Sequence, residues 1–514
     1  MITLIFLASL AVIGGAWWSW TVVQWVWLRP RAIEKCLRKQ GLNGPAYRLL
    51  HGDMNQMATM ARHAAVNSKP ISFSDDFLPI ILPFHHHIIQ TYGKNSFAWM
   101  GPTARINIMD PELIKEVLVN NKVYKKPIPN PLVRFLVSGI TSYEDQKWDK
   151  HRKILAPALT QDKLKHMASA MYTSCYDILV TEWKKLVSEK GSCELDVQPY
   201  IDDFASDVIS RNAFGSSYEQ GRRIYQLQKE QAVLTREVLQ SVYLPGRRFL
   251  PTKTNKRMKE IDNELRSILS KVMEQKELAM VSGRSGDNHE DLLSLLLKST
   301  MRANGDMGMT VDEAIEECKS FYFAGQESSS NLLVWTMILL SQHPIWQTRA
   351  REDVRQVFGQ NKPSYEGLSR LKVVTMILYE VLRLYSPATI FTRITYEETK
   401  LGDLIVPAGV QFLLPVIFVH HDREIWGEDA KEFKPERFSE GIAKATKNKL
   451  AFFPFSWGPR ICIGNNFALM EAKLAISTIL QHFLFELSPS YSHSPSYVVT
   501  LQPRHGAHLI LHKI

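Results

Sequence analysis

The chain has 514 residues, of which 45% are hydrophobic and 22% charged, a composition that supports a large folded core and excludes disorder over most of its length. Its formal net charge of +10 is compatible with a membrane surface or with an acidic protein partner. Nucleic acid is not an expected partner, because the chain has neither a recognised binding motif nor a basic run with interleaved aromatic residues.

The five cysteines are far apart and include no Cys-x-x-Cys pair. This pattern argues against a disulfide framework or a zinc site and favours a reducing compartment. Neither a linker rich in glycine, serine or proline nor a repeat divides residues 45–514. We therefore predict one large folded unit over that range.

The N-terminal segment has no charged side chain in residues 1–28. As a helix this segment would measure roughly 40 Å, which is enough to cross a bilayer. Five tryptophans occupy its second half and basic residues begin directly after it, as at a membrane interface. We predict a transmembrane signal anchor at 1–28, a helix end at Pro30, a basic hinge or linker at 29–44 and the folded domain at 45–514. A cleaved signal peptide and a buried core helix are the alternatives.

Trp148 and Arg152 lie in a stretch with a helical pattern. Their i, i+4 spacing places both side chains on one face of the helix. From that face the indole N–H and the guanidinium could both reach anionic carboxylates, although an ordinary amphipathic helix would have the same pattern.

A long helix is predicted from the capping box of Thr310 and Glu313 as far as Gln342. Its middle contains Gly325 and the serines of residues 328–330, which weaken a helix. We therefore expect the helix to widen locally there and to form a groove for water or dioxygen. A serine-rich kink without chemistry is the alternative.

Glu380 and Arg383 are neighbours on the next well-marked helix, because they are three residues apart. Such pairs are usually solvated and contribute little to stability. Residues 392–417 read as short strands separated by glycine and proline turns, and Arg393 lies in the first of them. We therefore predict a mainly α-helical fold with one small β-rich region.

The stretch from Phe455 to Gly464 places Cys462 two residues after Arg460. A thiolate is a strong ligand for haem iron and favours cleavage of an O–O bond. Gly458 and Gly464 permit a tight hairpin and the close approach of a flat ligand. A buried helix follows, and its N-terminus should lower the pKa of the thiol. We predict that Cys462 ligates iron, although a lone cysteine is more often a small buried apolar residue.

The stretch from Phe455 to Gly464 matches, without a gap, the Phe-x-x-Gly-x-Arg-x-Cys-x-Gly signature of the cytochrome P-450 superfamily. The chain is identified on this signature as a member of that superfamily, of the microsomal type. Further matching elements follow in the order of the superfamily: Trp148 with Arg152, residues 324–328, Glu380 with Arg383, and Arg437. Segments 321–327, 376–385 and 465–469 resemble the plant seventy-two family, the group of secologanin synthase and several triterpenoid and gibberellin oxidases.

The resemblance implies the cytochrome P-450 fold, haem b as cofactor and a role for each matching residue. Cys462 would be the axial ligand of the haem iron, and Glu327 with Ser328 would be the acid and alcohol that deliver protons, next to Gly325. Serine replaces the usual threonine of the superfamily at 328, so looser proton delivery is expected. The remaining cofactor contacts would be Trp148, Arg152, Arg393, Phe455, Arg460 and Gly464. The residues of a buried structural triad would be Glu380, Arg383 and Arg437.

The implied reaction inserts one oxygen atom of O2 into a C–H bond of a lipophilic substrate, of terpenoid, triterpenoid or gibberellin type. Electrons would come from NADPH through NADPH-cytochrome P-450 reductase. The resemblance also implies a single-pass protein of the endoplasmic reticulum membrane with its catalytic domain on the cytosolic face. A haem-thiolate isomerase or dehydratase and a non-catalytic haem sensor are the alternatives, and the pair Glu327 and Ser328 argues against both.

Overall fold

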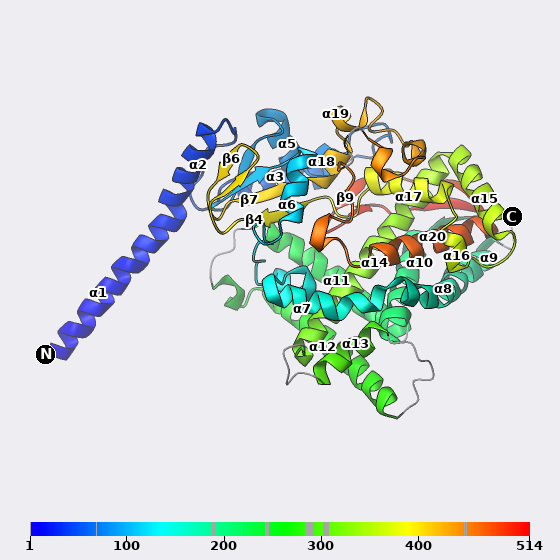
Figure 1. Ribbon diagram of the computed structural model, residues 1–514, viewed down its shortest axis with the longest axis horizontal. Coiled ribbons are helices and arrows are strands. Elements are labelled where there is room, and N and C mark those ends of the chain that lie inside the picture. The colour runs from blue at the N-terminus through cyan, green and yellow to red at the C-terminus, as the bar shows by residue number, and fades with distance from the viewer. Residues whose placement is uncertain are drawn as a thin grey trace.

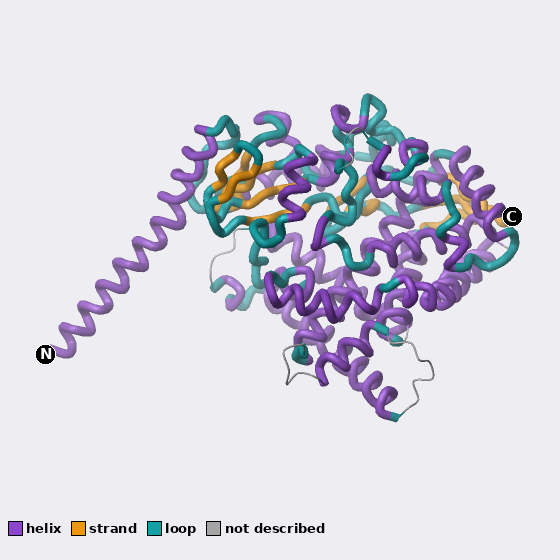
Figure 2. Tube along the Cα trace, viewed as in Figure 1, coloured by secondary structure: helices purple, strands orange, loops and turns teal. Residues whose placement is uncertain are grey.

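The computed structural model describes residues 2–67, 69–187, 191–216, 218–241, 246–282, 291–301, 308–446, 448 and 450–514. Helices fill most of the molecule, and strands gather mainly at the side where the N-terminal helix joins it (Figures 1 and 2). The predicted mainly α-helical fold with a small β-rich region is confirmed. One hydrophobic core extends along the chain from Ile33 to Leu511.

The described part of the chain has the following α-helices: α1 (Ile2–Val23), α2 (Arg29–Lys39), α3 (Met54–Asn67), α4 (Leu78–Ile81), α5 (Pro83–Tyr92), α6 (Pro111–Val119), α7 (Asp145–Leu155), α8 (Gln161–Cys175), α9 (Glu182–Val187), α10 (Gln198–Ile209), α11 (Tyr218–Leu239), α12 (Lys253–Val281), α13 (Leu292–Met301), α14 (Val311–Gln342), α15 (Pro344–Phe358), α16 (Tyr365–Leu368), α17 (Val373–Leu384), α18 (Val416–His420), α19 (Arg423–Trp426) and α20 (Asn465–His482). Short π and 3-10 turns join several of them: η1 (Gln24–Leu28), η2 (Val133–Phe135), η3 (Gly139–Thr141), η4 (Ala156–Leu159), η5 (Tyr176–Thr181), η6 (Ser210–Phe214), η7 (Arg247–Phe249), η8 (Pro435–Phe438), η9 (Ile442–Lys444) and η10 (Gly458–Arg460).

The strands of the described residues are β1 (Phe97–Met100), β2 (Thr103–Asn107), β3 (Ser192–Asp196), β4 (Phe391–Ile394), β5 (Thr399–Leu401), β6 (Leu404–Val406), β7 (Gln411–Leu414), β8 (Phe483–Leu487), β9 (Pro495–Tyr497), β10 (Leu501–Pro503) and β11 (His508–Lys513). The largest sheet has the order β1-β2-β7-β4, in which β2 and β7 are parallel and the other pairs antiparallel. A second sheet has the order β3-β11-β8, and β5-β6 and β9-β10 are antiparallel pairs. Arg393 of β4 is fixed opposite Phe412 of β7, so the sheet sets the position of this predicted site residue.

The prediction of a helix end at Pro30 followed by a linker is wrong. α1 passes through the π-helical turn η1 directly into α2, and Pro30 lies in the first turn of α2. Proline removes one N–H from this continuous helix, the π turn changes the hydrogen-bond register just before it, and the Tyr47 hydroxyl donates to the Val26 carbonyl, four residues before Pro30, at 2.6 Å. Ile33 and Leu37 are buried in the core, so α2 belongs to the folded part of the chain.

The N-terminal helix α1 projects away from the rest of the molecule (Figure 1). Its aromatic side chains face outwards, and Trp17 and Trp18 are 70% and 66% exposed. Judged by length and hydropathy, none of the helices among the described residues qualifies to cross a membrane. The transmembrane part of the fold prediction therefore stays a prediction.

Helix α14 runs through the centre of the molecule, between α10, α11 and α20 (Figure 1). The predicted capping box is confirmed: Thr310 accepts from the Glu313 N–H, and the Glu313 carboxylate accepts from the Thr310 N–H. The helix ends at Gln342, as predicted. The predicted local widening is wrong, because the α-helical pattern continues without interruption from residue 311 to 342. Contacts with α10, α11 and α20 keep this segment helical although its glycine and serines have low helix propensity.

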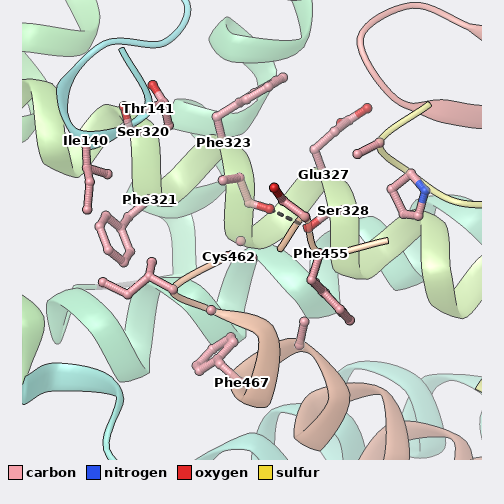
Figure 3. Close-up of a pocket in the computed structure, with 18 of the residues that line it drawn as sticks. Ile140, Thr141, Ser320, Phe321, Phe323, Glu327, Ser328, Phe455, Cys462 and Phe467 are labelled. Atoms are coloured by element: carbon pink, nitrogen blue, oxygen red, sulfur yellow. Dashed lines mark hydrogen bonds between the residues drawn. The ribbon is translucent and has the colours of Figure 1, made fainter. Parts of the chain in front are cut away.

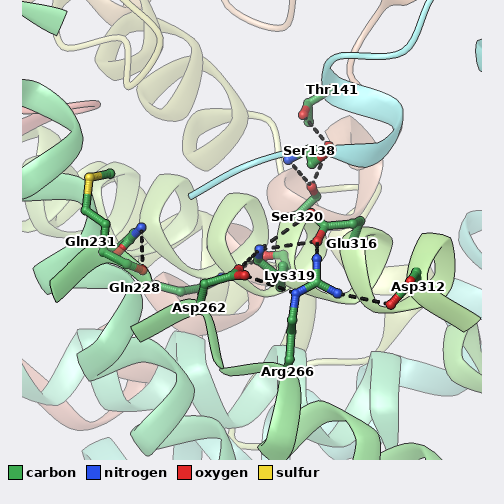
Figure 4. A network of polar contacts seen from close by, with 11 residues as sticks. Ser138, Thr141, Gln228, Gln231, Asp262, Arg266, Asp312, Glu316, Lys319 and Ser320 are labelled. Carbon is green, nitrogen blue, oxygen red and sulfur yellow. Dashed lines mark hydrogen bonds and ion pairs between the residues drawn. The ribbon is translucent and has the colours of Figure 1, made fainter. Parts of the chain in front are cut away.

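Ion pairs fix the first half of α14 to α12 (Figure 4). Lys319 is fully buried, and its Nζ lies 2.5 Å from Asp262 Oδ1 and 3.4 Å from Glu316 Oε1. Arg266 pairs with the same aspartate at 3.0 Å, with Asp312 at 3.2 Å and with Glu316. Buried charges require partners of opposite sign. The network therefore fixes the rotation of α14 relative to α12, and with it the direction of the side chains one to two turns further along.

Candidate active site

A cavity of about 450 Å³ lies between the middle of α14 and the loop that precedes α20. Figure 3 shows Cys462 and Phe467 on one side of this space, and Phe323, Glu327 and Ser328 of α14 on the other. Apolar side chains form most of the remaining wall, among them Ile140, Ile209, Leu332, Ala388 and Val499. The catalytic and cofactor residues that the sequence analysis predicts all line this one cavity: Gly325, Glu327, Ser328, Trp148, Arg152, Arg393, Phe455, Arg460, Cys462 and Gly464.

The loop that carries Cys462 is a tight turn that requires glycine at position 458. Gly458 has a φ of +71°, and a Cβ there would lie 2.9 Å from the carbonyl oxygen of Leu118. The loop closes where the Cys462 N–H donates to the Phe455 carbonyl at 2.9 Å. Gly464 differs, because a Cβ there would meet no protein atom within 4 Å. Its open side lines the cavity, which leaves room for a flat group to approach the backbone.

The Cys462 side chain lies deep inside the protein, yet its surface is open to the cavity. Burial raises the pKa of the thiol, while the Gly464 N–H, Arg152 and Lys126 act in the opposite direction. The prediction of a lowered pKa from the helix N-terminus is therefore wrong, because burial is the larger effect. A metal ion reverses the balance, because a coordinating thiol is deprotonated outright.

Buried and half-buried cations gather at one end of the cavity. Arg152 donates to the Ile461 carbonyl at 3.1 Å, and the Arg460 guanidinium lies 4.2 Å from the centre of the Trp148 ring. Arg460 also pairs with Glu144 at 2.8 Å. Burial lowers the pKa of Arg393 to about 10, and the neighbouring Arg460 adds to this effect.

Lys126 belongs to the same group of cations, although it was not among the predicted site residues. It lines the cavity, and its Nζ donates to the Thr141 carbonyl at 2.7 Å. Burial lowers the pKa of Lys126 to about 7, and the charges of Arg393 and Arg460 contribute. No pattern marks Lys126 in the sequence, because it lies in an irregular loop between α6 and η2 and reaches the cavity only through the fold.

The predicted acid and alcohol both face the cavity from α14 but do not bind each other. Ser328 Oγ donates to the Ala324 carbonyl at 2.6 Å. The Glu327 carboxyl instead accepts from the hydroxyl of Thr500 at 2.7 Å. Gly325 has a packing role, since a Cβ there would lie 2.8 Å from the Ile209 side chain of α10. It lets α10 approach α14 closely.

The predicted structural triad lies away from the cavity and is buried. Arg383 donates to both carboxylate oxygens of Glu380 at 2.7 Å, and both side chains are fully buried. Arg437 Nε lies 3.4 Å from the same carboxylate, and its Nη2 pairs with Asp429 at 2.7 Å. The three residues meet as predicted, Glu380 and Arg383 from α17 and Arg437 from η8.

Glu471 on α20 is a buried carboxyl group that no sequence pattern indicates. Neither oxygen of Glu471 has a hydrogen-bond partner among the described residues. Burial raises the pKa of Glu471 to about 8, and the adjacent Ser329 hydroxyl of α14 offsets this only in part. The group therefore holds its proton in the folded protein over much of the neutral range.

We predict that Glu471→Gln raises the thermal midpoint of unfolding at pH 8 and changes it much less near pH 5. The folded-state pKa lies above that of an unfolded chain, so the wild type loses stability as the pH rises from about 4.5 to about 8. At pH 7 the loss is at most about 3 kcal/mol. Thermal unfolding of both proteins across this range measures the effect, with Glu428→Gln, whose carboxylate is 91% exposed, as the control. Parallel pH profiles for wild type and Glu471→Gln would contradict the assignment.

The residues around the cavity fit an iron porphyrin. The chain supplies one open thiol, a glycine with free space above it, and an apolar wall. The cations Lys126, Arg152, Arg393 and Arg460 all line the cavity, and of these Glu144 forms an ion pair with Arg460, so positive charge remains to be balanced there. Two propionate groups would complete that balance, because arginine binds carboxylates with paired hydrogen bonds.

Comparison with known proteins places the chain in a family. The profile of the family described as Cytochrome P450 matches residues 80–509. Cytochrome P450 CYP72A219 of Panax ginseng is 55% identical over 96% of this chain and 96% of its own. Secologanin synthase 2 and 7-deoxyloganic acid hydroxylase, both of Catharanthus roseus, are 49% and 51% identical over 97% of this chain and 95% and 96% of their own. The chain therefore belongs to the cytochrome P450 family and is a monooxygenase, which implies a haem iron, O2, a small-molecule substrate and a redox partner.

Proposed function

We propose that the protein hydroxylates or oxidises a lipophilic plant terpenoid, triterpenoid or gibberellin-type molecule, with haem b held by Cys462. Electrons come from NADPH through NADPH-cytochrome P450 reductase. The observation that carries the proposal is the open Cys462 thiol, which faces Glu327 and Ser328 across an apolar cavity. Haem bound to a cysteine thiolate supplies the activation of dioxygen.

The protein residues have separate tasks in this proposal. The Cys462 loop holds the thiol at a fixed place, since its turn is closed by the hydrogen bond to Phe455. Arg152, Arg393 and Arg460, together with Lys126, bind the propionates and so orient the ring. The apolar wall binds the substrate and excludes water, which limits reactions without product.

Two residues of α14, Glu327 and Ser328, supply protons in this proposal. Glu327 is held inside the protein, and burial raises its pKa, with a contribution from the charge of Asp202. A carboxyl group with a raised pKa holds its proton to higher pH than an exposed one and can release it into the cavity. The Ser328 hydroxyl, one residue further, can accept and donate a hydrogen bond and so pass the proton on.

We predict that Ser328→Thr raises the fraction of NADPH oxidation that ends in product. The expected increase is roughly two- to fivefold, which corresponds to restricting the side chain at 328 to one rotamer. Serine lacks the β-methyl group that restricts χ1, so its hydroxyl samples more positions than a threonine hydroxyl. The ratio of product formed to NADPH consumed measures this effect. Ser341→Thr is the control. Like Ser328, Ser341 lies on α14 and its hydroxyl donates to the carbonyl four residues earlier, that of Met337, at 2.8 Å, but it lies away from the cavity. An unchanged ratio in Ser328→Thr would refute looser proton delivery by the serine.

Support for the substrate class comes from the cavity and from the relatives. The wall is mainly apolar, and the charged groups gather at the propionate end and on α14. Such a pocket selects by shape and hydrophobicity. Two of the relatives carry the names Secologanin synthase 2 and 7-deoxyloganic acid hydroxylase.

We further propose that the enzyme resides in the endoplasmic reticulum membrane, attached through its N-terminal segment, with the catalytic domain in the cytosol. Support comes from the absence of charge in residues 1–28 and from the exposed tryptophans of α1. The excess of positive charge supports docking to an acidic reductase. Retention of the full chain in microsomes after carbonate extraction, and its loss on removal of residues 1–28, tests the attachment.

The proposed function is tested by product analysis. The full chain, reductase, NADPH and O2 are combined with panels of terpenoids, triterpenoids and gibberellins. Product that gains one oxygen atom from labelled O2, and that disappears without NADPH or reductase, supports the proposal. Product formed without O2 or reductase would instead support an isomerase or dehydratase, and haem binding without any turnover would support a sensor.

A further inference from the structure

The hydroxyl group of Thr500, near the C-terminus, binds the carboxyl group of Glu327 on α14. Thr500 lies in the turn between β9 and β10, and its Oγ1 donates to Glu327 Oε1 at 2.7 Å. Asn331, one helical turn after Glu327, donates through Nδ2 to Thr500 Oγ1 at 3.0 Å and to the Glu327 backbone carbonyl at 2.8 Å. The three side chains form a directed chain of hydrogen bonds from amide to hydroxyl to carboxyl.

The turn that carries Thr500 is itself fixed. β9 and β10 pair in antiparallel register, with Leu501 opposite Tyr497. The indole N–H of Trp335 on α14 donates to the Leu501 carbonyl at 3.0 Å, and the Leu501 N–H donates to the Pro387 carbonyl at 3.2 Å. The hydroxyl of Thr500 therefore meets Glu327 at a defined place. Its branched Cβ also restricts the direction of the hydroxyl.

The same turn forms part of the wall around the substrate. Val499 and Thr500 both line the cavity, as does Glu327. A molecule that fills the cavity therefore touches the turn that holds the acid. No other segment of the described chain donates a side-chain hydrogen bond to this carboxyl group apart from Asn331, whose Nδ2 lies 3.4 Å from Oε1.

We propose that Thr500 is a positioning residue: its hydroxyl, supported by Asn331, holds the Glu327 carboxyl group toward the cavity and couples substrate contact at the β9-β10 turn to proton supply. This inference rests on the proposed role of Glu327 in proton supply. It adds the residue that sets the direction of the carboxyl group and the segment through which the substrate can influence it.

The charges around Glu327 set the direction of the expected pH effect. Burial raises the pKa of Glu327 and the charge of Asp202 adds to this, whereas the bonds from Thr500 and Asn331 and the charge of Lys229 lower it. Asp202 is itself held by Lys229 at 3.3 Å and by Tyr225 at 2.9 Å. Loss of the Thr500 hydroxyl removes a hydrogen bond that lowers the pKa of Glu327. The pKa of Glu327 therefore moves to higher pH in a variant without it.

The variants are Thr500→Val, which keeps the shape and removes the hydroxyl, and Thr500→Ser, which keeps the hydroxyl. Thr500→Ala, which has neither the hydroxyl nor a γ-methyl group, carries the same prediction should the valine variant not fold. The matched control is Thr336→Val on α14, whose buried hydroxyl donates only to the Leu332 carbonyl at 2.7 Å. Haem content and the absorption spectrum of each holoenzyme establish that the site is assembled.

The first measurement does not require turnover. The infrared band of the protonated Glu327 carboxyl group is assigned as the difference between wild-type holoenzyme and Glu327→Gln, and is followed against pH. Its midpoint is expected at higher pH in Thr500→Val than in the wild type, and at the wild-type value in Thr500→Ser and Thr336→Val. An unchanged midpoint in Thr500→Val overturns the positioning role.

The second measurement is the ratio of product to NADPH consumed. It is expected to fall roughly tenfold in Thr500→Val, as for loss of one hydrogen bond to a buried charged group, and to recover in Thr500→Ser. Equal losses in the valine and serine variants overturn the role of the hydroxyl and indicate packing alone. If Glu327→Gln couples as well as the wild type, the proton-supply role of Glu327 fails, while the infrared midpoint still decides whether Thr500 holds the carboxyl group.

Discussion

Replacing Glu380 by alanine is expected to prevent accumulation of folded, haem-loaded protein. The carboxylate binds Arg383 through both oxygens and lies 3.4 Å from Arg437. It also accepts from the Lys434 N–H at 2.9 Å. Its removal leaves a fully buried guanidinium without its counter-charge. Breaking a buried pair in this way costs about 3–5 kcal/mol, against a total stability of about 5–15 kcal/mol for a folded domain.

The expected loss is measured as haem absorbance and circular dichroism per mass of purified protein. Glu436→Ala is the control, because Glu436 lies in the same segment, is 58% exposed and is 3.8 Å from its partner Arg349. Glu380→Gln, which keeps hydrogen-bond acceptance but not charge, should lie between wild type and Glu380→Ala. Glu380→Ala protein with normal haem content and normal helicity would show that the triad is dispensable.

Replacing Cys462 by serine is expected to abolish turnover while leaving the fold intact. The thiol faces the cavity, and the turn is held by backbone contacts of Cys462 and Gly458, so the side chain contributes little to folding. A serine hydroxyl cannot replace the electron donation of a thiolate to iron. Product formation should therefore fall to the background measured without reductase.

The matched control for this variant is Cys193→Ser, since Cys193 is a half-buried free cysteine on β3, away from the cavity. Thermal unfolding compares the folds of the two variants, and product analysis compares their activities. A Cys462→Ser enzyme that turns over above background would mean that this cysteine is not the ligand. Loss of activity in Cys193→Ser as well would show that the assay reports general damage.

Local signals in the sequence were enough to predict the long central helix and the cysteine loop. The capping box of Thr310 and Glu313 fixes where α14 begins, and the glycine at 458 is required by a positive φ. Pairs such as Trp148 with Arg152, three or four residues apart on a helix, can be recognised because spacing alone sets which face they share.

Contacts between distant segments carry no such signal. Glu144 meets Arg460, and Glu327 meets Thr500, only because the fold brings four separate segments to one cavity. Lys126 reaches the site from an irregular loop in the same way. The N-terminal prediction failed for a related reason: buried apolar contacts of Ile33 and Leu37 keep residues 29–39 helical past Pro30.

The prediction of a local defect in α14 was wrong because packing outweighs helix propensity. Gly325 and the adjacent serines weaken an isolated helix by roughly 1 kcal/mol per glycine, but here Gly325 admits Ile209 of α10 and Ser330 binds Asp202. Such tertiary contacts contribute more than the local cost, and the helix stays regular. The candidate site therefore depends on side-chain direction along α14, which sequence patterns do not define.

The central claim is that Cys462 binds haem iron as a thiolate. The reduced holoenzyme exposed to carbon monoxide tests this most directly, as a difference spectrum of the full chain in membranes. We predict a Soret band shifted to long wavelength, as produced by a thiolate opposite carbon monoxide, and its absence in Cys462→Ser. A reduced carbon monoxide complex of the wild type with the short-wavelength band of a histidine-ligated haem would contradict the assignment.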